Sequence, residues 1–194
     1  SPHRAIEQAR CYVEDGYTYV VDIDLSKFFD RVHHDRLMHR IATRVGDKRV
    51  LKLIRSYLNS GVLTGDVIVE TEEGTPQGGP LSPLLANIVL DELDKELEKR
   101  GLRFVRYADD VAIYVRSPKA AQRVKQSVSR FITRKLKLVI NEQKSEVSRP
   151  WQSKYLGFRI TRFMGHTRIG IHEKSLRRFR ERVREITARK RGRS

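Results

Sequence analysis

Two adjacent acids, Asp109 and Asp110, interrupt a β-prone apolar stretch of the sequence. Apolar Leu102, Phe104 and Val105 precede them, and the apolar run 111–115 follows. Two such runs that meet at a polar pair predict a tight β-hairpin with both carboxylates at its tip. Because successive strand residues point to opposite faces, one carboxylate is expected to face a site while its neighbour leans against it from the turn. An acidic pair is by itself common turn chemistry, so the interpretation depends on a second acidic segment.

That second segment is residues 20–25, which alternate in polarity. Its apolar members Val21, Ile23 and Leu25 are expected on one face of a strand, and Asp22 and Asp24 on the other. Acids in a buried strand are unfavourable unless something neutralises them, and a divalent cation is the simplest neutralising group. A strand acid and a hairpin-tip acid pair are therefore compatible with a two-metal phosphoryl-transfer site. In such a site two Mg²⁺ ions lie about 3.5–4 Å apart.

The charge balance favours a nucleic-acid partner. The 194 residues include 40 Lys and Arg against 24 Asp and Glu, a net charge of +16. A compact domain with that charge is expected to attract a polyanion. A membrane is the less favoured polyanion, because no apolar run approaches about 18–20 residues and no helix has the bulky apolar face of an anchor. With 39% hydrophobic residues, the chain has enough apolar side chains for the core of one sizeable domain.

The termini and the single cysteine bear on location and completeness. We find no signal peptide, and one cysteine, Cys11, excludes an internal disulfide. A reducing location is therefore expected, cytoplasmic in a bacterium or organellar in a eukaryote. Cys11 itself is predicted to be a small buried hydrophobe. The sequence begins without Met and ends in the basic run 189–193, so we expect a fragment of a longer protein.

Hydrophobic periodicity predicts the order of the elements. Helices are expected before Gly16, twice within 35–59, from Ser82 to Gly101, from Ser117 onward and over 175–190, with Ser1, Ser82 and Ser117 as helix starts. β-prone segments besides the hairpin are 20–25, 62–71, 138–140, 155–160 and 167–171, and 72–80 is a Gly- and Pro-rich loop. This order predicts an α+β fold, an antiparallel sheet with helices packed on one face and the other face open for a ligand.

Five motifs occur in order along nearly the whole chain. They are Asp-Leu-Ser-Lys-Phe-Phe-Asp at 24–30 followed by His-Asp at 34–35, Gly-Thr-Pro-Gln-Gly-Gly-Pro-Leu-Ser-Pro-Leu-Leu-Ala-Asn at 74–87, Tyr-Ala-Asp-Asp at 107–110, Asn-Glu-Gln-Lys-Ser at 141–145 and Tyr-Leu-Gly-Phe at 155–158. Together they resemble the polymerase-type palm of a reverse transcriptase, most closely of the group II intron-encoded class. The resemblance implies that 1–172 form this palm with residual fingers elements. It also implies that 173–194 are a basic helix, the truncated start of a thumb or maturase region.

The same resemblance implies a catalytic set. Asp24, Asp109 and, more loosely, Asp110 would hold two Mg²⁺ ions together with the backbone carbonyl of Leu25. The substrate triphosphate would supply the remaining oxygens, because Mg²⁺ is commonly completed by substrate phosphates. Lys144 would act as general acid for the departing pyrophosphate, since an ammonium group both pairs with phosphate and can lend a proton.

Further positions would contact the nucleotide and the primer. Phe29 would lie under the incoming sugar and exclude a ribose 2′-hydroxyl by its bulk. Gln77 and Gly78 would approach the nascent base pair or the sugar, and Ala108 would face the terminal base pair. Primer or template contacts are implied at the hairpin and at the closing motif, by Tyr107, Tyr155, Leu156 and Gly157. The last three would form a turn that positions the primer end.

Several residues have no role in this resemblance or depart from it. Asp22 shares the face of Asp24, and we predict it at the surface or in a salt bridge. The histidines at 33, 34 and 39 lack the spacing of a zinc site, and His34 is expected to cap or pack near a helix start. Leu-Lys-Leu at 136–138 replaces the family's Leu-Gly-Leu, and Ser145 stands where Thr is common.

Two functions of different classes follow. The first is a Mg²⁺-dependent RNA-directed DNA polymerase of a group II intron-encoded protein, which adds a dNTP to a DNA or RNA primer on an intron RNA template. The alternative is a non-catalytic RNA-binding maturase scaffold that assists splicing. Substitution of Asp109 separates them, because polymerisation should vanish while RNA binding survives. A palm-type nucleotide cyclase is less favoured, since a small substrate needs no long basic track. Homodimerisation stays open.

Overall fold

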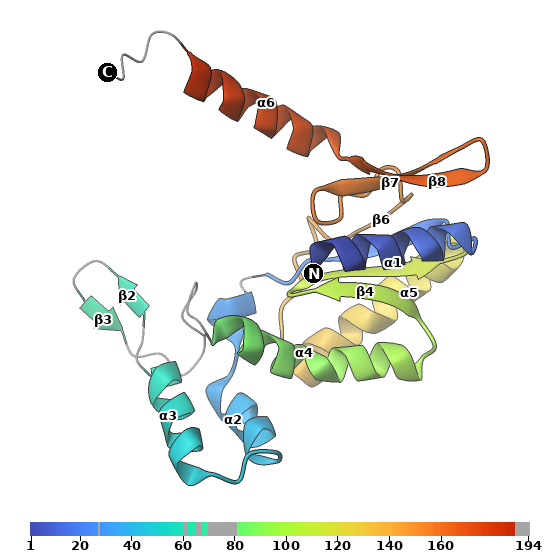
Figure 1. Cartoon of the computed structure of the whole chain (residues 1–194). Helices are drawn as coiled ribbons and strands as arrows, with labels where there is room; N and C mark the ends of the chain where they lie inside the picture. The colour runs from blue at the N-terminus through green and yellow to red at the C-terminus, as the bar shows by residue number, and fades with distance from the viewer. Residues whose placement is uncertain (27, 60–61, 65–66, 70–80, 189–194) are drawn as a thin grey trace.

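The structure is a computed structural model that describes residues 1–26, 28–59, 62–64, 67–69 and 81–188 (Figure 1). Its helices are α1 (Pro2–Glu14), α2 (His34–Ala42), α3 (Lys48–Asn59), α4 (Ser82–Lys99), α5 (Pro118–Phe131) and α6 (Glu173–Thr187). Its strands are β1 (Tyr19–Ile23), β2 (Val62–Thr64), β3 (Val67–Val69), β4 (Arg103–Tyr107), β5 (Asp110–Val115), β6 (Glu146–Ser148), β7 (Phe158–Phe163) and β8 (His166–Ile171). A 3₁₀ turn, η1 (Phe28–Arg31), and a π-helical turn, η2 (Ile132–Leu136), complete the order.

A four-stranded antiparallel sheet in the order β4-β5-β1-β6 forms the centre of the fold. The predicted hairpin is confirmed, with β4 and β5 joined through the pair Tyr107 and Asp110. The two-residue turn between them contains Ala108 at φ 54°. Positive φ in a two-residue hairpin loop matches the twist of the flanking strands. β2 with β3 and β7 with β8 form separate two-stranded sheets.

One face of the sheet carries the larger core. Val21, Ile23 and Leu25 are buried in one cluster, which confirms the predicted alternation of residues 20–25. Apolar side chains of β5 and of the helices α2, α4 and α5 belong to the same cluster. Figure 1 shows α4 and α5 on this side of the sheet. The α+β fold with helices against an antiparallel sheet is therefore confirmed.

The opposite face is only partly open, unlike the fully open face that the sequence predicted. Ile6 and Val13 of α1 pack there in a second cluster with Val20 and Tyr114 of the sheet, and α1 lies across this face in Figure 1. The periodicity of α1 reveals an apolar stripe but not the face on which it packs. The uncovered part of the face is the end where the strand acids lie.

Helix starts and strand limits differ in detail from the sequence predictions. Ser117 caps α5 as predicted, accepting a hydrogen bond from the N–H of Ala120 at 3.2 Å. The cap predicted at Ser82 is wrong: Leu81 holds the N-cap position, and the buried Ser82 hydroxyl lies 3.3 Å from that of Tyr57. Ser1 makes no side-chain cap hydrogen bond, although it holds the N-cap position of α1.

The strand predicted at 138–140 reduces to an isolated bridge between Ile140 and Leu25. The edge of the sheet is β6 instead, three residues that pair with β1. His34 is the first residue of α2 and is buried, which confirms its predicted packing near a helix start. Cys11 is half-buried, so its predicted full burial is wrong.

The C-terminal helix α6 follows the β7–β8 hairpin and projects away from the sheet (Figure 1). No residue of α6 is buried, and its apolar side chains include Phe179 at 65% and Ile186 at 71% exposure. The helix therefore contributes little to the core. In the described part of the chain, no helix is both long enough and apolar enough to cross a membrane.

Candidate active site

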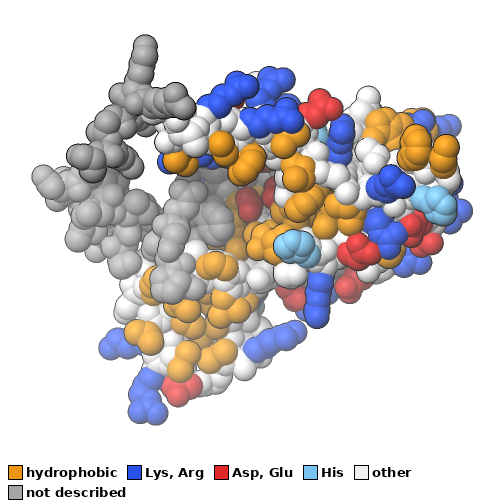
Figure 2. Space-filling model, turned by 45° about the horizontal axis from the view of Figure 1, so that its top comes forward, with side chains coloured by type: hydrophobic (Ala, Val, Ile, Leu, Met, Phe, Trp, Pro, Cys, Tyr) orange, Lys and Arg blue, Asp and Glu red, His pale blue; other side chains and the backbone are white. Residues whose placement is uncertain are grey.

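Four acids lie on the uncovered part of the second face. In the register of the sheet, Asp22 of β1 pairs with Ala112 of β5 and with Glu146 of β6. Asp24 follows β1, and Asp110 begins β5. Together with Lys144, Lys154 and Tyr155 these acids line a cleft of about 150 Å³. In Figure 2 acidic side chains are recessed in a hollow of the surface, beside hydrophobic ones. The fold therefore brings residues of four of the five sequence motifs together in one cleft.

The carboxylates in this cleft interact electrostatically. The pKa of Asp110 is raised mainly by partial desolvation of its carboxylate, and further by the negative charges of Asp109 and Asp24. The positive charge of Lys154 opposes this rise. Such mutual repulsion disfavours ionising every acid at once. A bound divalent cation would relieve this repulsion, so the donor set fits a hard metal ion such as Mg²⁺.

The two hairpin acids occupy different places. Asp110 lines the cleft, whereas Asp109 lies in the two-residue turn next to it and is half-buried. From the resemblance, Asp109 was expected to be the firmer metal ligand of the two and Asp110 the looser one. Within the described residues, no three His, Cys, Asp or Glu side chains converge closely enough to hold a metal ion.

The backbone around Asp24 is held by the motif at 141–145. The N–H of Asp24 donates to Ser145 Oγ at 3.0 Å, and the N–H of Asn141 donates to the Asp24 carbonyl at 2.9 Å. Lys125 Nζ of α5 in turn donates to the Ser145 carbonyl at 2.6 Å. Ser145 is buried, so this contact is shielded from water. Sequence reasoning noted Ser145 only as a departure and missed that it positions Asp24.

Replacement of Ser145 by Ala is expected to destabilise the fold by about 1–2 kcal/mol, because it leaves the N–H of Asp24 without its acceptor. Ser145→Thr retains the hydroxyl and should stay within about 0.5 kcal/mol of the parent. Urea unfolding monitored by circular dichroism gives both values. Equal stability of the Ala and Thr variants would show that the Ser145 hydroxyl does not hold Asp24.

The backbone hydrogen bonds on either side of the bridge between Leu25 and Ile140 do not use the carbonyl oxygen of Leu25. Leu25 faces Ile140, and the two flanking hydrogen bonds use the Asp24 carbonyl and the N–H of Ser26. In such a non-hydrogen-bonded pair of an antiparallel ladder, the two facing residues form no hydrogen bond with each other through their own peptide groups. The Leu25 side chain is buried in the core, so the metal contact that the resemblance implies for Leu25 would use its backbone oxygen.

Arg106 fixes the hairpin turn to α4. Its Nε and Nη2 donate to the two carboxylate oxygens of Asp94 at 2.7 and 2.5 Å. Its Nη1 donates to Asn87 Oδ1 and to the carbonyl of Ala108, each at 2.9 Å. The forked pair is largely shielded, with Arg106 at 12% and Asp94 at 24% side-chain exposure. Sequence reasoning assigned Arg106 no role, although the residue directly precedes the Tyr-Ala-Asp-Asp motif.

Asp22 differs from its predicted placement. It was expected at the surface or in a salt bridge, but it lines the cleft and accepts a hydrogen bond from Ser153 Oγ at 2.8 Å. No ion pair to Asp22 occurs in the part of the chain that the structure describes. Burial raises its pKa to about 7, the Ser153 hydrogen bond opposes this, and Glu146 and Asp110 add to the rise. Only the three-dimensional register places Glu146 and Ser153 beside it.

The raised pKa of Asp22 predicts a pH-dependent stability. The folded protein binds this proton more tightly than the unfolded chain, whose Asp pKa is about 3.9. Asp22 therefore contributes stability in full below about pH 4, and this contribution is lost as the pH rises through about 7. In EDTA, Tm should fall between pH 5 and 8 more steeply for the parent than for Asp22→Asn. Parallel Tm profiles would contradict the assignment.

The closing motif forms a tight turn, as predicted. Tyr155 and Phe158 exchange backbone hydrogen bonds at 3.0 and 2.9 Å, with Leu156 at φ 51° and Gly157 at φ 88° between them. Positive φ at both central residues defines a type I′ turn. Tyr155 is buried against the cleft, and its hydroxyl has no hydrogen-bond partner among the described residues. Burial raises its pKa, and Asp110 and Asp22 raise it further.

The remaining predicted site residues are placed as follows. Lys144 is exposed and lines the acidic cleft. Tyr107 ends β4 at 40% exposure, and Ala108 is half-buried in the turn. Phe29 belongs to η1, but its side chain is outside what the structure describes. Gln77 and Gly78 lie outside the described residues.

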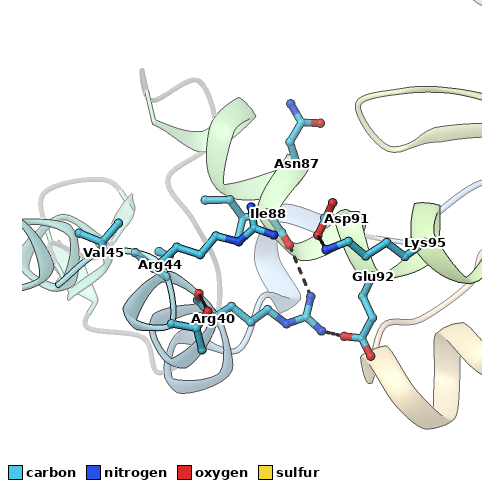
Figure 3. Close-up of a pocket in the computed structure, with 10 residues that line it drawn as sticks. Arg40, Arg44, Val45, Asn87, Ile88, Asp91, Glu92 and Lys95 are labelled. Atoms are coloured by element: carbon cyan, nitrogen blue, oxygen red, sulfur yellow. Dashed lines mark hydrogen bonds and ion pairs between the residues drawn. The ribbon is translucent and has the colours of Figure 1, made fainter.

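A larger cavity, of about 570 Å³, lies between α2 and α4 (Figure 3). Its charged side chains mostly pair with each other: Arg40 with Glu92, and Lys95 with Asp91. Arg40 also donates to the carbonyl of Val89 at 2.8 Å. None of the five sequence motifs contributes an acid to it. The smaller acidic cleft is therefore the better candidate for the catalytic centre.

Comparison of the sequence with known proteins agrees with the five motifs. Residues 1–160 match the reverse transcriptase (RNA-dependent DNA polymerase) family. Group II intron-encoded protein LtrA of Lactococcus lactis subsp. cremoris is 30% identical over 210 residues, covering 75% of this chain and 35% of LtrA. Protein YkfC of Escherichia coli K12 is 29% identical over 185 residues, covering 76% of this chain and 49% of YkfC. The chain thus spans half or less of the length of these relatives.

Comparison of the fold with solved structures finds a similar arrangement in a telomerase. The apo telomerase of Candida tropicalis superposes with a TM-score of 0.64 over 86% of this chain and 35% of the telomerase chain. The sequence identity in that comparison is 14%, so the likeness concerns the fold alone. It supports the description of the sheet and its helices as a palm-type α+β arrangement.

Proposed function

Since this chain belongs to the reverse transcriptase family, we propose that it is the catalytic palm of an RNA-directed DNA polymerase of a group II intron-encoded protein. The observation that carries the proposal is the cleft in which Asp24 and Asp110, from two separate motifs, share one face of the sheet. The similarity to LtrA, a group II intron-encoded protein, supports the intron class. The substrates would be a dNTP, a DNA or RNA primer and an intron RNA template.

The acids of the cleft would hold the cofactor and the substrate triphosphate. Asp24, Asp109, Asp110 and the carbonyl oxygen of Leu25 would bind two Mg²⁺ ions. Bound there, these ions would supply activation of the primer 3′-hydroxyl and stabilisation of charge at the α-phosphorus. The Lys144 ammonium, which lines the same cleft, would pair with the departing pyrophosphate and give it a proton.

The rest of the chain would position the nucleic acid. Residues 1–172 would form the palm with residual fingers elements, and 173–194 would begin a thumb or maturase region. Phe29, Gln77 and Gly78 would contact the incoming nucleotide. The turn at 155–157 and Tyr107 would lie along the primer. The cations of α6 are exposed, which suits sequence-independent contacts with phosphates.

Primer extension tests the proposal. A DNA primer on an RNA template is incubated with the full 194-residue chain, Mg²⁺ and the four dNTPs, with Asp109→Ala as the paired variant. We expect incorporation by the parent chain and none by the variant. Extension that persists in Asp109→Ala would refute the assigned metal site.

A second function rests on a different observation. Helix α6 exposes its cations together with apolar side chains, among them Phe179 and Ile186. The alternative is a non-catalytic maturase scaffold that binds intron RNA. Absence of extension by the parent chain, with RNA still bound equally by the parent and Asp109→Ala, would favour this alternative over the polymerase.

A further inference from the structure

The charges of the two helices beneath the sheet are strongly segregated. Between Asp110 and Glu142 the sequence contains eight Lys and Arg residues and no Asp or Glu. This segment includes α5 and the π-helical turn η2. The neighbouring helix α4 has the opposite balance, with five acids and two lysines. The segment between Asp110 and Glu142 therefore carries a charge of +8, half of the net charge of +16 of the chain.

Four of these cations form a stripe on the outer surface of α5 and η2. Lys119, Arg123, Arg130 and Arg134 are all exposed, and none of them forms an ion pair with another described residue. At 3.6 residues per turn the first three lie within about 40° of one another around the helix. At 1.5 Å per residue the stripe is about 22 Å long. We call these four residues the α5 basic stripe.

Helix stability does not explain the stripe. Lys119 lies in the first turn of α5, where the helix dipole disfavours a cation, and that turn contains no acid. Packing does not explain it either, because α5 packs against the sheet through Ala121, Val124 and Val128. The stripe is on the opposite, solvent-facing side of the helix. Its charge is therefore available to an external anion.

The stripe lies on the far side of the sheet from the acidic cleft. The buried residues of α5 share their cluster with Val21 and Ile23, whereas Asp24 and Asp110 belong to the other face. Figure 1 shows α5 and α1 on opposite sides of the sheet. A helix is about 10–12 Å across, so its outer surface is separated from the cleft by this helix and the sheet. A primer–template duplex in the cleft would not reach the stripe.

The side chains between the cations indicate the kind of anion. Gln122, Gln126 and Thr133 are exposed beside the stripe, and no large apolar side chain is exposed there. A membrane-binding helix would present an apolar face beside its cations, so a lipid surface fits poorly. Amide and hydroxyl groups interleaved with cations suit 2′-hydroxyls and phosphates, which double-stranded RNA displays along its wide minor groove.

We propose that the α5 basic stripe is a second nucleic-acid site, which binds the backbone of a double-stranded segment of folded RNA while the cleft is free to hold a primer–template. The contacts are to phosphates and 2′-hydroxyls, so the site recognises RNA by shape and not by base sequence. Binding at this site requires neither Mg²⁺ nor polymerisation. The proposed RNA site can therefore be tested independently of the catalytic assignment.

The test measures binding of a fluorescent RNA hairpin, with a stem of about 16 base pairs, to the full chain in EDTA. Unlabelled primer–template in excess occupies the cleft. The variant replaces all four stripe residues with Gln, a good helix former. We expect it to bind the hairpin about tenfold or more weakly at 0.1 M salt, with a salt slope shallower by about three. Its affinity for the primer–template should change by less than about twofold.

A matched control removes the same charge elsewhere. Replacing the exposed Arg44, Lys48, Arg49 and Lys52 with Gln takes four cations from the α2–α3 surface. This control variant should bind the hairpin like the parent. Equal weakening in the control would overturn the proposal, as would one-for-one displacement of the hairpin by primer–template. The parent and the stripe variant are also compared with a DNA hairpin of the same sequence and with anionic vesicles. If the variant's affinity for either falls as much as its affinity for the RNA hairpin, the assignment to RNA is wrong.

Discussion

Asp24→Asn is expected to reduce nucleotide incorporation by on the order of 10³-fold while the protein stays folded. Asp24 lies in the cleft with Asp110 and is fixed through its backbone by Ser145. An amide in its place retains the size of the side chain but removes the charge that would attract Mg²⁺. Without metal, the loss of one carboxylate also relieves repulsion with Asp110. The Tm of the variant in EDTA should therefore be equal to or higher than that of the parent.

Two measurements together check this prediction. Single-turnover primer extension gives the rate, and thermal unfolding with and without millimolar Mg²⁺ gives the stability. Mg²⁺ together with primer–template and dNTP should raise Tm of the parent more than that of Asp24→Asn, because only a bound ligand stabilises by mass action. The control is Glu98→Gln, which removes an exposed acid of α4 outside the cleft and should retain parental rate and Tm. A lowered Tm of Asp24→Asn in EDTA would contradict the electrostatic account.

Arg106→Lys should destabilise the fold by about 2–4 kcal/mol, although it retains the positive charge. An ammonium cannot reproduce the two parallel bonds to Asp94 while also reaching Asn87 and the Ala108 carbonyl. The turn that carries Asp109 would lose its attachment to α4. We therefore expect kcat for incorporation to fall more than the affinity for primer–template. Urea unfolding and steady-state extension measure the two effects.

A surface pair provides the control for Arg106. Lys95 and Asp91 form an exposed ion pair on α4, with 59% and 53% side-chain exposure. Lys95→Gln should change stability by less than about 0.5 kcal/mol, as is typical of exposed helix pairs. If Arg106→Lys is as mild as Lys95→Gln, then Arg106 does not anchor the hairpin. If its stability falls with kcat unchanged, the anchor serves the fold and not the placement of Asp109.

Local residue patterns were sufficient to predict the elements that carry the acids. The alternation at 20–25 and the paired runs around Asp109 and Asp110 predicted one strand and one hairpin, and both are confirmed. These features depend on neighbours within a few residues, which the sequence displays directly. The family also followed from the sequence, because five short motifs in fixed order identify it without knowledge of their contacts.

Tertiary structure alone decided how the acids are supported and which of them share a cleft. Ser145 contacts Asp24 across 121 residues of sequence, and Ser153 contacts Asp22 across 131. No local sequence pattern predicts contacts over such separations. The raised pKa of Asp22 comes from burial beside β6, which depends on strand pairing. The packing of α1 on the second face likewise depends on long-range contacts. Periodicity identifies an apolar side of each element, whereas the partner of that side is fixed only when the whole chain packs.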